Sequence, residues 1–196
     1  MPARDKGLSP RERLLAAADE LFYNEGIHTV GIDRIIEKAG VAKGSLYYNF
    51  DGKDDLVRQY LLGRFTKTAS RLEHAVAGTD DPRERVLRVF DSLGERLRDP
   101  DFRGCAFARA TAEAPTDGPE AEETAAFRDW LHGFFNRLTA DLAVENAPVL
   151  AEQLILLYDG TRSAFQMDRD PKASDAARAV AEVLLDAALQ HPEAPH

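Results

Sequence analysis

Apolar residues recur three and four positions apart along most of this chain, and this period is the strongest constraint on its fold. In the first long segment, Leu14, Leu21 and Phe22 fall on one face of a helix. No long stretch alternates apolar and polar residues, and β-branched residues are sparse, so strands are not expected. The sequence therefore predicts an all-α protein with about nine helices.

Start and stop signals near the amino terminus predict a long helix. Ser9 is a candidate N-cap, Pro10 occupies the first helical position, and Glu12 completes the sequence of a capping box. Gly26 stands where a residue in the left-handed conformation would end the helix.

Two shorter helices follow, joined by a glycine turn. An isoleucine-rich segment over residues 29–40 is stopped by Gly40, and the segment 41–50 leaves room only for a tight turn before the next helix. A long helix followed by two short ones is the helix-turn-helix plan. We therefore expect a DNA-binding domain over residues 1–53 and a helical bundle over residues 54–196.

The charge of the chain argues against bulk attraction to nucleic acid. The net charge is −9, whereas a generic phosphate binder carries an excess of lysine and arginine. Residues 1–60 hold nine basic and ten acidic residues, so most of the negative charge lies in residues 61–196. From Lys38 to Lys53 three lysines face a single acid, Asp51. An anion-binding surface is therefore expected in this part of the chain.

Other features restrict the class of protein. Cys105 is the only cysteine, which rules out an internal disulfide, and no structural zinc site is expected. A small buried apolar role is favoured for Cys105 over a redox role. The histidines show no metal-ligand spacing. The first residues carry charge without a following apolar stretch, so no secretory signal is expected, and since no apolar run approaches about 18 residues, no membrane span is expected. These features favour a cytoplasmic protein.

The segment GIDRIIEKAGVAKGSLYYNFDGKDDLV resembles the DNA-binding module of the TetR/AcrR family of bacterial transcriptional regulators. RGCAFARATAE and LILLYDGTRSA resemble segments of the regulatory domain of one branch of the family, so the resemblance spans nearly the whole chain. There are two departures. Asn49 stands where the family often has histidine, and Gly52 stands where a serine is usual before the lysine.

A recognition helix enters the major groove with its first turn leading, so its residues must be small or able to donate hydrogen bonds. Leu46 and Phe50 should point inward. The residues expected to contact bases or phosphates are Lys43, Gly44, Ser45, Tyr47, Tyr48 and Asn49. The resemblance implies further backbone contacts from Thr29, Gly31 and Lys53. The alternative is that the tyrosines are half-buried aromatics with hydrated hydroxyls and that the lysines are ordinary surface residues.

The resemblance also implies a mainly apolar effector cavity within the helical bundle. The candidates for its lining are Phe90, Cys105, Phe107, Trp130, Phe134 and Tyr158. An aromatic stripe at helical spacing is more often ordinary core, and that alternative stays open.

Two recognition modules about 34 Å apart reach successive major grooves, so we expect a homodimer. The last two helices are the expected interface. The apolar residues on their expected faces are Leu150, Leu154, Leu157, Tyr158 and Phe165, then Ala176, Val180, Val183, Leu184 and Ala187. These stripes could instead pack inside one subunit.

The sequence therefore predicts a homodimeric regulator, expected to be a repressor, that binds double-stranded operator DNA and responds to a small apolar or aromatic effector. No cofactor is expected. One alternative is an all-α small-molecule-binding protein or enzyme, although no nucleophile-base pair, carboxylate dyad, metal motif or phosphate loop is present. The other is an orphan regulator whose packed core admits no ligand.

Overall fold

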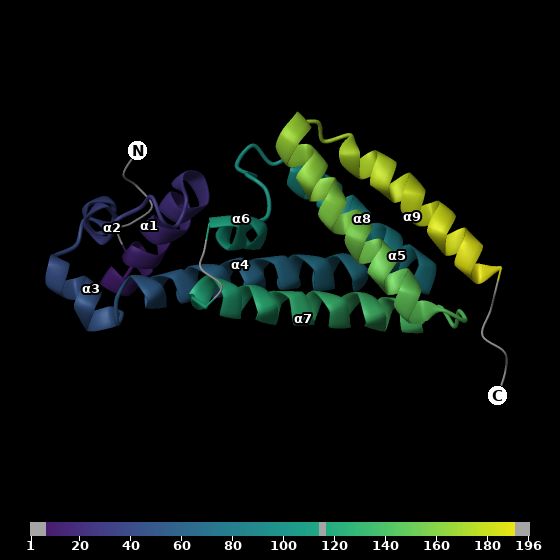
Figure 1. The fold of residues 1–196 in the computed structure, drawn as a ribbon, viewed down its shortest axis with the longest axis horizontal. Coiled ribbons are helices and arrows are strands. Elements are labelled where there is room, and N and C mark those ends of the chain that lie inside the picture. The colour runs from purple at the N-terminus through teal and green to yellow at the C-terminus, as the bar shows by residue number, and fades with distance from the viewer. Residues whose placement is uncertain (1–6, 114–116, 191–196) are drawn as a thin grey trace. The chain divides into compact units, whose positions relative to one another are not determined.

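The computed structural model describes residues 7–113 and 117–190, and within these ranges the chain forms nine helices and no strand (Figure 1). The predicted all-α class is confirmed. The helices are α1 (Pro10–Glu25), α2 (Ile32–Ala39), α3 (Lys43–Asn49), α4 (Lys53–Val76), α5 (Pro82–Leu97), α6 (Ala106–Glu113), α7 (Pro119–Ala140), α8 (Ala147–Asp168) and α9 (Ala173–Leu189).

The chain divides by its internal contacts into two compact units. The first contains the residues up to 66 together with 106–126, and the second contains 67–105 together with the residues from 127 onward. Helices α4 and α7 therefore each begin in the first unit and continue in the second. The functional boundary expected after residue 53 is a different kind of division and stays a prediction.

The start of α1 follows its sequence signals. Pro10 is the first helical residue, the Ser9 side chain accepts a hydrogen bond from the Glu12 backbone, and the Glu12 carboxylate accepts one from the Ser9 backbone at 2.7 Å. The Ser9 hydroxyl also donates to the Glu12 carboxylate, at 2.8 Å. The bonds that the carboxylate accepts from the Ser9 backbone and from the Ser9 hydroxyl lower the pKa of Glu12 below its ordinary value. Gly26 does take a positive φ of 98°, but its ψ of 148° lies outside the left-handed helical region that the sequence predicts.

In the second unit, α9 packs on both α5 and α8, and it runs beside α8 in Figure 1. The contact with α5 is close at Gly94, where a Cβ atom would lie 2.8 Å from the Ser174 Oγ atom and 3.3 Å from the Ser174 Cβ atom. Arg178 of α9 also pairs with Asp91 of α5 at 2.8 Å. Gly94 is therefore a packing requirement of this helix pair.

Replacing Gly94 with alanine is expected to lower the free energy of unfolding by about 1–2 kcal/mol, because overpacking outweighs the higher helix propensity of alanine. Ser174 can move only if its hydroxyl gives up the 2.8 Å hydrogen bond to the Pro171 carbonyl. Urea denaturation measures the change. If the Gly94→Ala protein is as stable as the original, then α5 and α9 can move apart to accommodate the methyl group without a loss of free energy, and the close contact at Gly94 is not a packing requirement.

Five residues of α8 were expected to form its dimer face, and for four of them this prediction is wrong. Leu150, Leu154, Tyr158 and Phe165 are buried within the single chain, and Leu157 is half-buried. They pack inside the second unit because α8 is apolar on more than one side. The apolar residues that α8 exposes are Val149, Leu156 and Met167.

Candidate nucleic-acid interface

The turn between α2 and α3 is held by one glycine and one arginine. Gly40 ends α2 in the left-handed region, at φ 60° and ψ 42°, a conformation that glycine adopts without strain. The Arg13 side chain of α1 donates to the Gly40 carbonyl oxygen at 2.9 Å. A guanidinium at the carboxyl end of a helix meets the negative end of its dipole. Arg13 therefore holds the turn against α1, a role that sequence reasoning did not identify.

Beneath this turn lies an apolar core that fixes the orientation of α3. Leu46 of α3 and Phe50 just after it are buried, as the sequence predicts, and so is Ile35 of α2. Leu21 and Phe22 of α1 are buried in the same unit. Because Leu46 faces the core, the residues on either side of it in α3 face outward.

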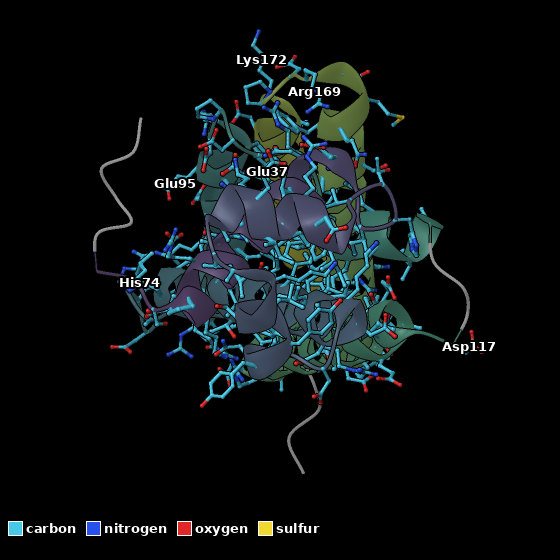
Figure 2. All side chains as sticks on the ribbon, turned by 90° about the vertical axis from the view of Figure 1, so that its left-hand side faces the viewer. Glu37, His74, Glu95, Asp117, Arg169 and Lys172 are labelled. Carbon is cyan, nitrogen blue, oxygen red and sulfur yellow. The ribbon has the colours of Figure 1, made fainter. Side chains whose placement is uncertain are left out.

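The outward face of α3 carries the aromatic residues. Tyr47 is 56% exposed and Tyr48 is 90% exposed, so Tyr48 is not the half-buried aromatic of the alternative interpretation. Lys43 and Gly44 are exposed at the start of the helix and Ser45 is half-buried. The labelled Glu37 in Figure 2 belongs to α2 and is exposed. The predicted contact residues of α3 thus share one accessible helix.

Gly44 has no structural reason within the described chain to be glycine. It lies inside α3, where its backbone is helical, and no atom other than those of its immediate helix lies within 4 Å of the position of a Cβ. Glycine in a helix is less stable than alanine by about 0.5–1 kcal/mol. A glycine that the fold does not require is expected where another molecule approaches the backbone closely.

Lys43 is paired in the free protein with a carboxylate of the preceding helix. Its Nζ atom lies 3.0 Å from the Asp33 Oδ1 atom, and both side chains are well exposed. The hydrogen bond to Asp33 and the negative charge of Asp33 raise the pKa of Lys43 above its ordinary value. Asp33 therefore competes with any phosphate or base acceptor for Lys43, and sequence reasoning did not identify it.

Replacing Asp33 with asparagine is expected to raise DNA affinity about threefold to tenfold at low salt, because Lys43 is released and a negative charge near the phosphates is removed. Fluorescence anisotropy with labelled duplex DNA measures the effect. Asp175→Asn is the matched control, since Asp175 is also exposed and paired with an arginine, Arg98, but lies in α9. Equal affinities for Asp33→Asn and the original protein would contradict the competition.

The remaining predicted residues flank α3. Thr29 and Gly31 are exposed just before α2, and Gly31 also has no neighbour within 4 Å of a Cβ position. Asn49 is half-buried and donates from its Nδ2 atom to the Ser45 carbonyl oxygen at 2.7 Å, so part of its donor capacity serves α3 itself. Lys53 begins α4 and is half-buried with no ion-pair partner among the residues described. The positive charge of a lysine is unfavourable near the positive, amino-terminal end of a helix dipole, so the position of Lys53 does not stabilise α4.

The residues predicted to line an effector cavity are mostly core. Phe90, Phe134 and Tyr158 are buried in the second unit, where Cys105 and Trp130 are half-buried. Trp130 stacks on Phe134 with ring centroids 5.2 Å apart. Phe107 is buried in the first unit. Their lining of a common cavity stays a prediction.

Two kinds of site find no support in the described part of the chain. Across residues 7–113 and 117–190, no group of three His, Cys, Asp or Glu side chains is placed to hold a metal ion. None of the helices there combines the length and the apolar character that a membrane span needs.

Comparison with known proteins assigns the family. Residues 14–60 match the family described as bacterial regulatory proteins, tetR family. The solved structure of SCO4454, a TetR-family transcriptional regulator from Streptomyces coelicolor, is 34% identical, with a TM-score of 0.87 over 92% of this chain and 90% of that chain. The chain belongs to the TetR family of transcriptional regulators. Both the helix-turn-helix assignment and the family resemblance are thereby confirmed, and the proteins it resembles are regulators rather than enzymes.

Two curated relatives of this chain differ in their named direction of regulation. The transcriptional activator FasR of Mycolicibacterium smegmatis is 37% identical over 83 residues, and the transcriptional repressor KstR2 of Mycobacterium tuberculosis is 32% identical over 89 residues. These matches cover 42% and 45% of this chain. They span only 38% of FasR and 44% of KstR2, less than half of either protein. The family assignment therefore does not fix the direction of regulation for this chain.

Proposed function

We propose that this protein is a homodimeric repressor that binds double-stranded operator DNA through α3 and leaves it when a small-molecule effector binds. The observation that carries the DNA-binding part is the exposed face of α3. Gly44 is exposed without a structural need for glycine, and Tyr47 and Tyr48 are exposed beside it on a helix whose other side is anchored by Leu46. An exposed aromatic pair next to an unhindered backbone is suited to approach by DNA.

The proposed roles follow from the chemistry of each group. Lys43 and Ser45 reach base edges or phosphates from the first turn of α3, where Gly44 permits close approach. Tyr47, Tyr48 and Asn49 donate hydrogen bonds to phosphate oxygens and so fix register without reading sequence. Thr29, Gly31 and Lys53 supply further contacts to the DNA backbone. We place the boundary of this DNA-binding domain at residue 53 and assign effector binding and dimerisation to residues 54–196.

The proposed dimer interface is the exposed face of α8 and α9. On α8, Val149, Leu156 and Gly160 recur at helical spacing, and Leu156 is 71% exposed. On α9, Val180 is exposed and Val183 is 67% exposed. Gly160 has no neighbour within 4 Å of a Cβ position, so a partner helix can approach closely there.

A groove at one end of this face gives the proposed partner a place to seat a side chain. It has a volume of about 680 Å³ between the start of α8 and the end of α9, and its lining includes Val149, Leu184 and Ala187. The two helices from each subunit would form a four-helix bundle about a two-fold axis. This arrangement would present two copies of α3 to successive major grooves. A cytoplasmic location follows from such a role.

The experiment is a fluorescence-anisotropy titration of the purified protein against duplex DNA from its own upstream region, with a scrambled duplex as control. We expect sequence-selective binding of one or two dimers that weakens strongly between about 50 mM and about 200 mM salt. If both duplexes bind equally weakly, the titration is repeated with ligand-free protein and a selected DNA pool. Equally weak, unselective binding in that repeat would overturn the proposal.

Lysine variants test whether the exposed face of α3 is the surface that binds DNA. Lys43→Gln should weaken binding, and its slope of log affinity against log salt should fall by about two, because a dimer loses two phosphate contacts. If Lys43 instead contacts only a base, specificity falls with little change in slope. Lys172→Gln is the matched control, since Lys172 is exposed between α8 and α9, as labelled in Figure 2, and should bind as the original protein does.

A further inference from the structure

Arg71 lies in the part of α4 that belongs to the second unit, and it bonds to two hydroxyl groups there. Its Nη1 atom donates to the Ser92 Oγ atom of α5 at 2.6 Å, and its Nη2 atom donates to the Tyr158 hydroxyl of α8 at 3.1 Å. Ser92 and Tyr158 are both buried, and Arg71 is half-buried. One guanidinium thus joins three helices through neutral partners.

The positive charge of Arg71 has no carboxylate partner among the described residues, which sets it apart from most half-buried arginines there. Arg64, Arg85 and Arg128, for example, pair with Asp19, Asp141 and Asp159. A guanidinium withdrawn from water without a counter-ion is costly, so an anion that can reach it is bound favourably.

Two other half-buried arginines without a carboxylate partner have a different explanation. Arg13 and Arg109 donate to the backbone carbonyl oxygens of Gly40 and Tyr23, at 2.9 Å and 2.6 Å. Those carbonyls lie at the carboxyl ends of α2 and α1, where the helix dipole is negative. Arg71 meets only two hydroxyls, which carry no such field. The fold therefore offsets the positive charges of Arg13 and Arg109 with the negative ends of helix dipoles, but it places no negative charge or dipole end against Arg71.

The two hydroxyls that accept from Arg71 keep their own hydrogens for another acceptor. A hydroxyl can donate one hydrogen bond while it accepts others. The Thr161 hydroxyl uses that capacity within its helix by donating to the Leu157 carbonyl oxygen at 2.6 Å. Among the described residues, neither the Ser92 hydroxyl nor the Tyr158 hydroxyl donates a hydrogen bond. Arg71, Ser92 and Tyr158 thus form one hydrogen-bonded cluster whose two hydroxyls can each still donate.

A groove between α4 and α5 reaches Arg71 and Ser92 from the surface, and Tyr158 is not part of its wall. It has a volume of about 520 Å³, within the range of small-molecule sites, and Arg71 and Ser92 form part of its wall. The other charged or titratable lining residues are His74, Arg88, Asp91 and Glu95.

The acids of the groove do not neutralise Arg71. Asp91 is engaged by Arg178 at 2.8 Å, and Arg88 by Glu84 at 3.3 Å. Glu95 is exposed, and in Figure 2 the labelled Glu95 and His74 extend outward from the chain. The rim of the groove is therefore mixed in charge, whereas its inner end is positive.

We propose that this groove binds an organic acid through its carboxylate, with Arg71 as counter-ion and the Ser92 hydroxyl as a donor. This assignment rests on the proposed function in one respect, since it identifies the effector of the repressor as a carboxylate rather than a purely apolar compound. A bound carboxylate would compete with the Tyr158 hydroxyl of α8 for the Arg71 guanidinium. That competition would act directly on α4, the helix that begins at Lys53.

The test measures binding by isothermal titration calorimetry and thermal shift in the absence of DNA. The probes are octanoate, 4-phenylbutyrate and salicylate, each compared with its neutral carboxamide. At least one carboxylate is expected to bind saturably and about tenfold more tightly than its carboxamide. If no carboxylate binds, or if each acid and its amide bind equally, the proposal is overturned.

Variants locate the binding. Arg71→Gln should lose about tenfold or more in carboxylate affinity, and Arg71→Lys should lose less, because the charge remains while the paired donors are lost. Ser92→Ala gives a second test that leaves the charge in place. Arg137→Gln is the matched control, since Arg137 is an exposed arginine paired with Glu73 of α4, and it should bind as the original protein does. Undiminished binding by folded Arg71→Gln would overturn the site.

A separate titration distinguishes the site from the regulatory role. The carboxylate that binds best is added to the complex of protein and operator DNA, and release is followed by anisotropy. Release that is lost in Arg71→Gln supports both the site and the repressor. Carboxylate binding without any release from operator DNA leaves the site established and counts against the effector mechanism of the proposed function.

Discussion

Replacing Gly44 with alanine is expected to stabilise the free protein and to weaken its binding to operator DNA, two effects of opposite sign. The free energy of unfolding should rise by about 0.5–1 kcal/mol, because alanine loses less backbone entropy in a helix than glycine does. No other segment of the described chain lies within 4 Å of the added methyl group, so no packing cost opposes this gain. Urea denaturation measures the change.

The operator affinity of Gly44→Ala should fall by about tenfold or more, because the methyl group occupies space that the DNA backbone or a base edge needs at the start of α3. Fluorescence anisotropy measures it. Gly133→Ala is the matched control: Gly133 is also an exposed glycine inside a helix, α7, with nothing within 4 Å of a Cβ position. It should gain similar stability without loss of DNA affinity. Undiminished operator binding by Gly44→Ala would mean that this turn of α3 does not approach the DNA.

The same substitution is expected to have the reverse effect on stability at Gly94, and sequence alone does not separate the two positions. Both glycines lie within helices at places that the local pattern leaves open. Only the packing of α9 on α5, which brings Ser174 against Gly94, distinguishes them. A close approach between segments that are distant in sequence leaves no local signal.

The helix-turn-helix was predictable because its signals are local. Ser9 and Glu12 form a capping box within four residues, and Gly40 takes the left-handed conformation within its own turn. The burial of Leu46 and Phe50 follows from helical spacing once these boundaries are fixed. Local chemistry was therefore sufficient for the module that carries the candidate interface.

Features that depend on tertiary partners were not predictable. The pairing of Asp33 with Lys43 and the uncompensated charge of Arg71 both depend on which helices are neighbours. The same dependence on tertiary neighbours explains why the dimer face of α8 was predicted wrongly. Leu154 and Leu156 are both apolar, yet Leu154 is fully buried and Leu156 is exposed. A helix that is apolar on two sides does not reveal which side meets its own subunit.

Replacing Leu156 with arginine is expected to convert the proposed dimer into a folded monomer. Leu156 is 71% exposed in the single chain, so the substitution removes little packing within the subunit. In a two-fold interface each variant chain places its arginine near the arginine of the partner, and both guanidinium groups lose water. The dimer dissociation constant should rise by about 100-fold or more, equivalent to about 2.8 kcal/mol. Analytical ultracentrifugation measures the change, and circular dichroism checks the fold.

Loss of the dimer should also remove most operator binding, because a monomer brings one copy of α3 instead of two. The slope of log affinity against log salt should fall to about half of its original value as half of the phosphate contacts disappear. Leu62→Arg is the matched control, since Leu62 is an exposed leucine of α4 outside the proposed interface. It should remain dimeric. A dimeric Leu156→Arg protein would show that α8 does not face the partner. A monomer with undiminished operator affinity would instead separate dimerisation from DNA binding, and the spacing of two modules would no longer explain recognition.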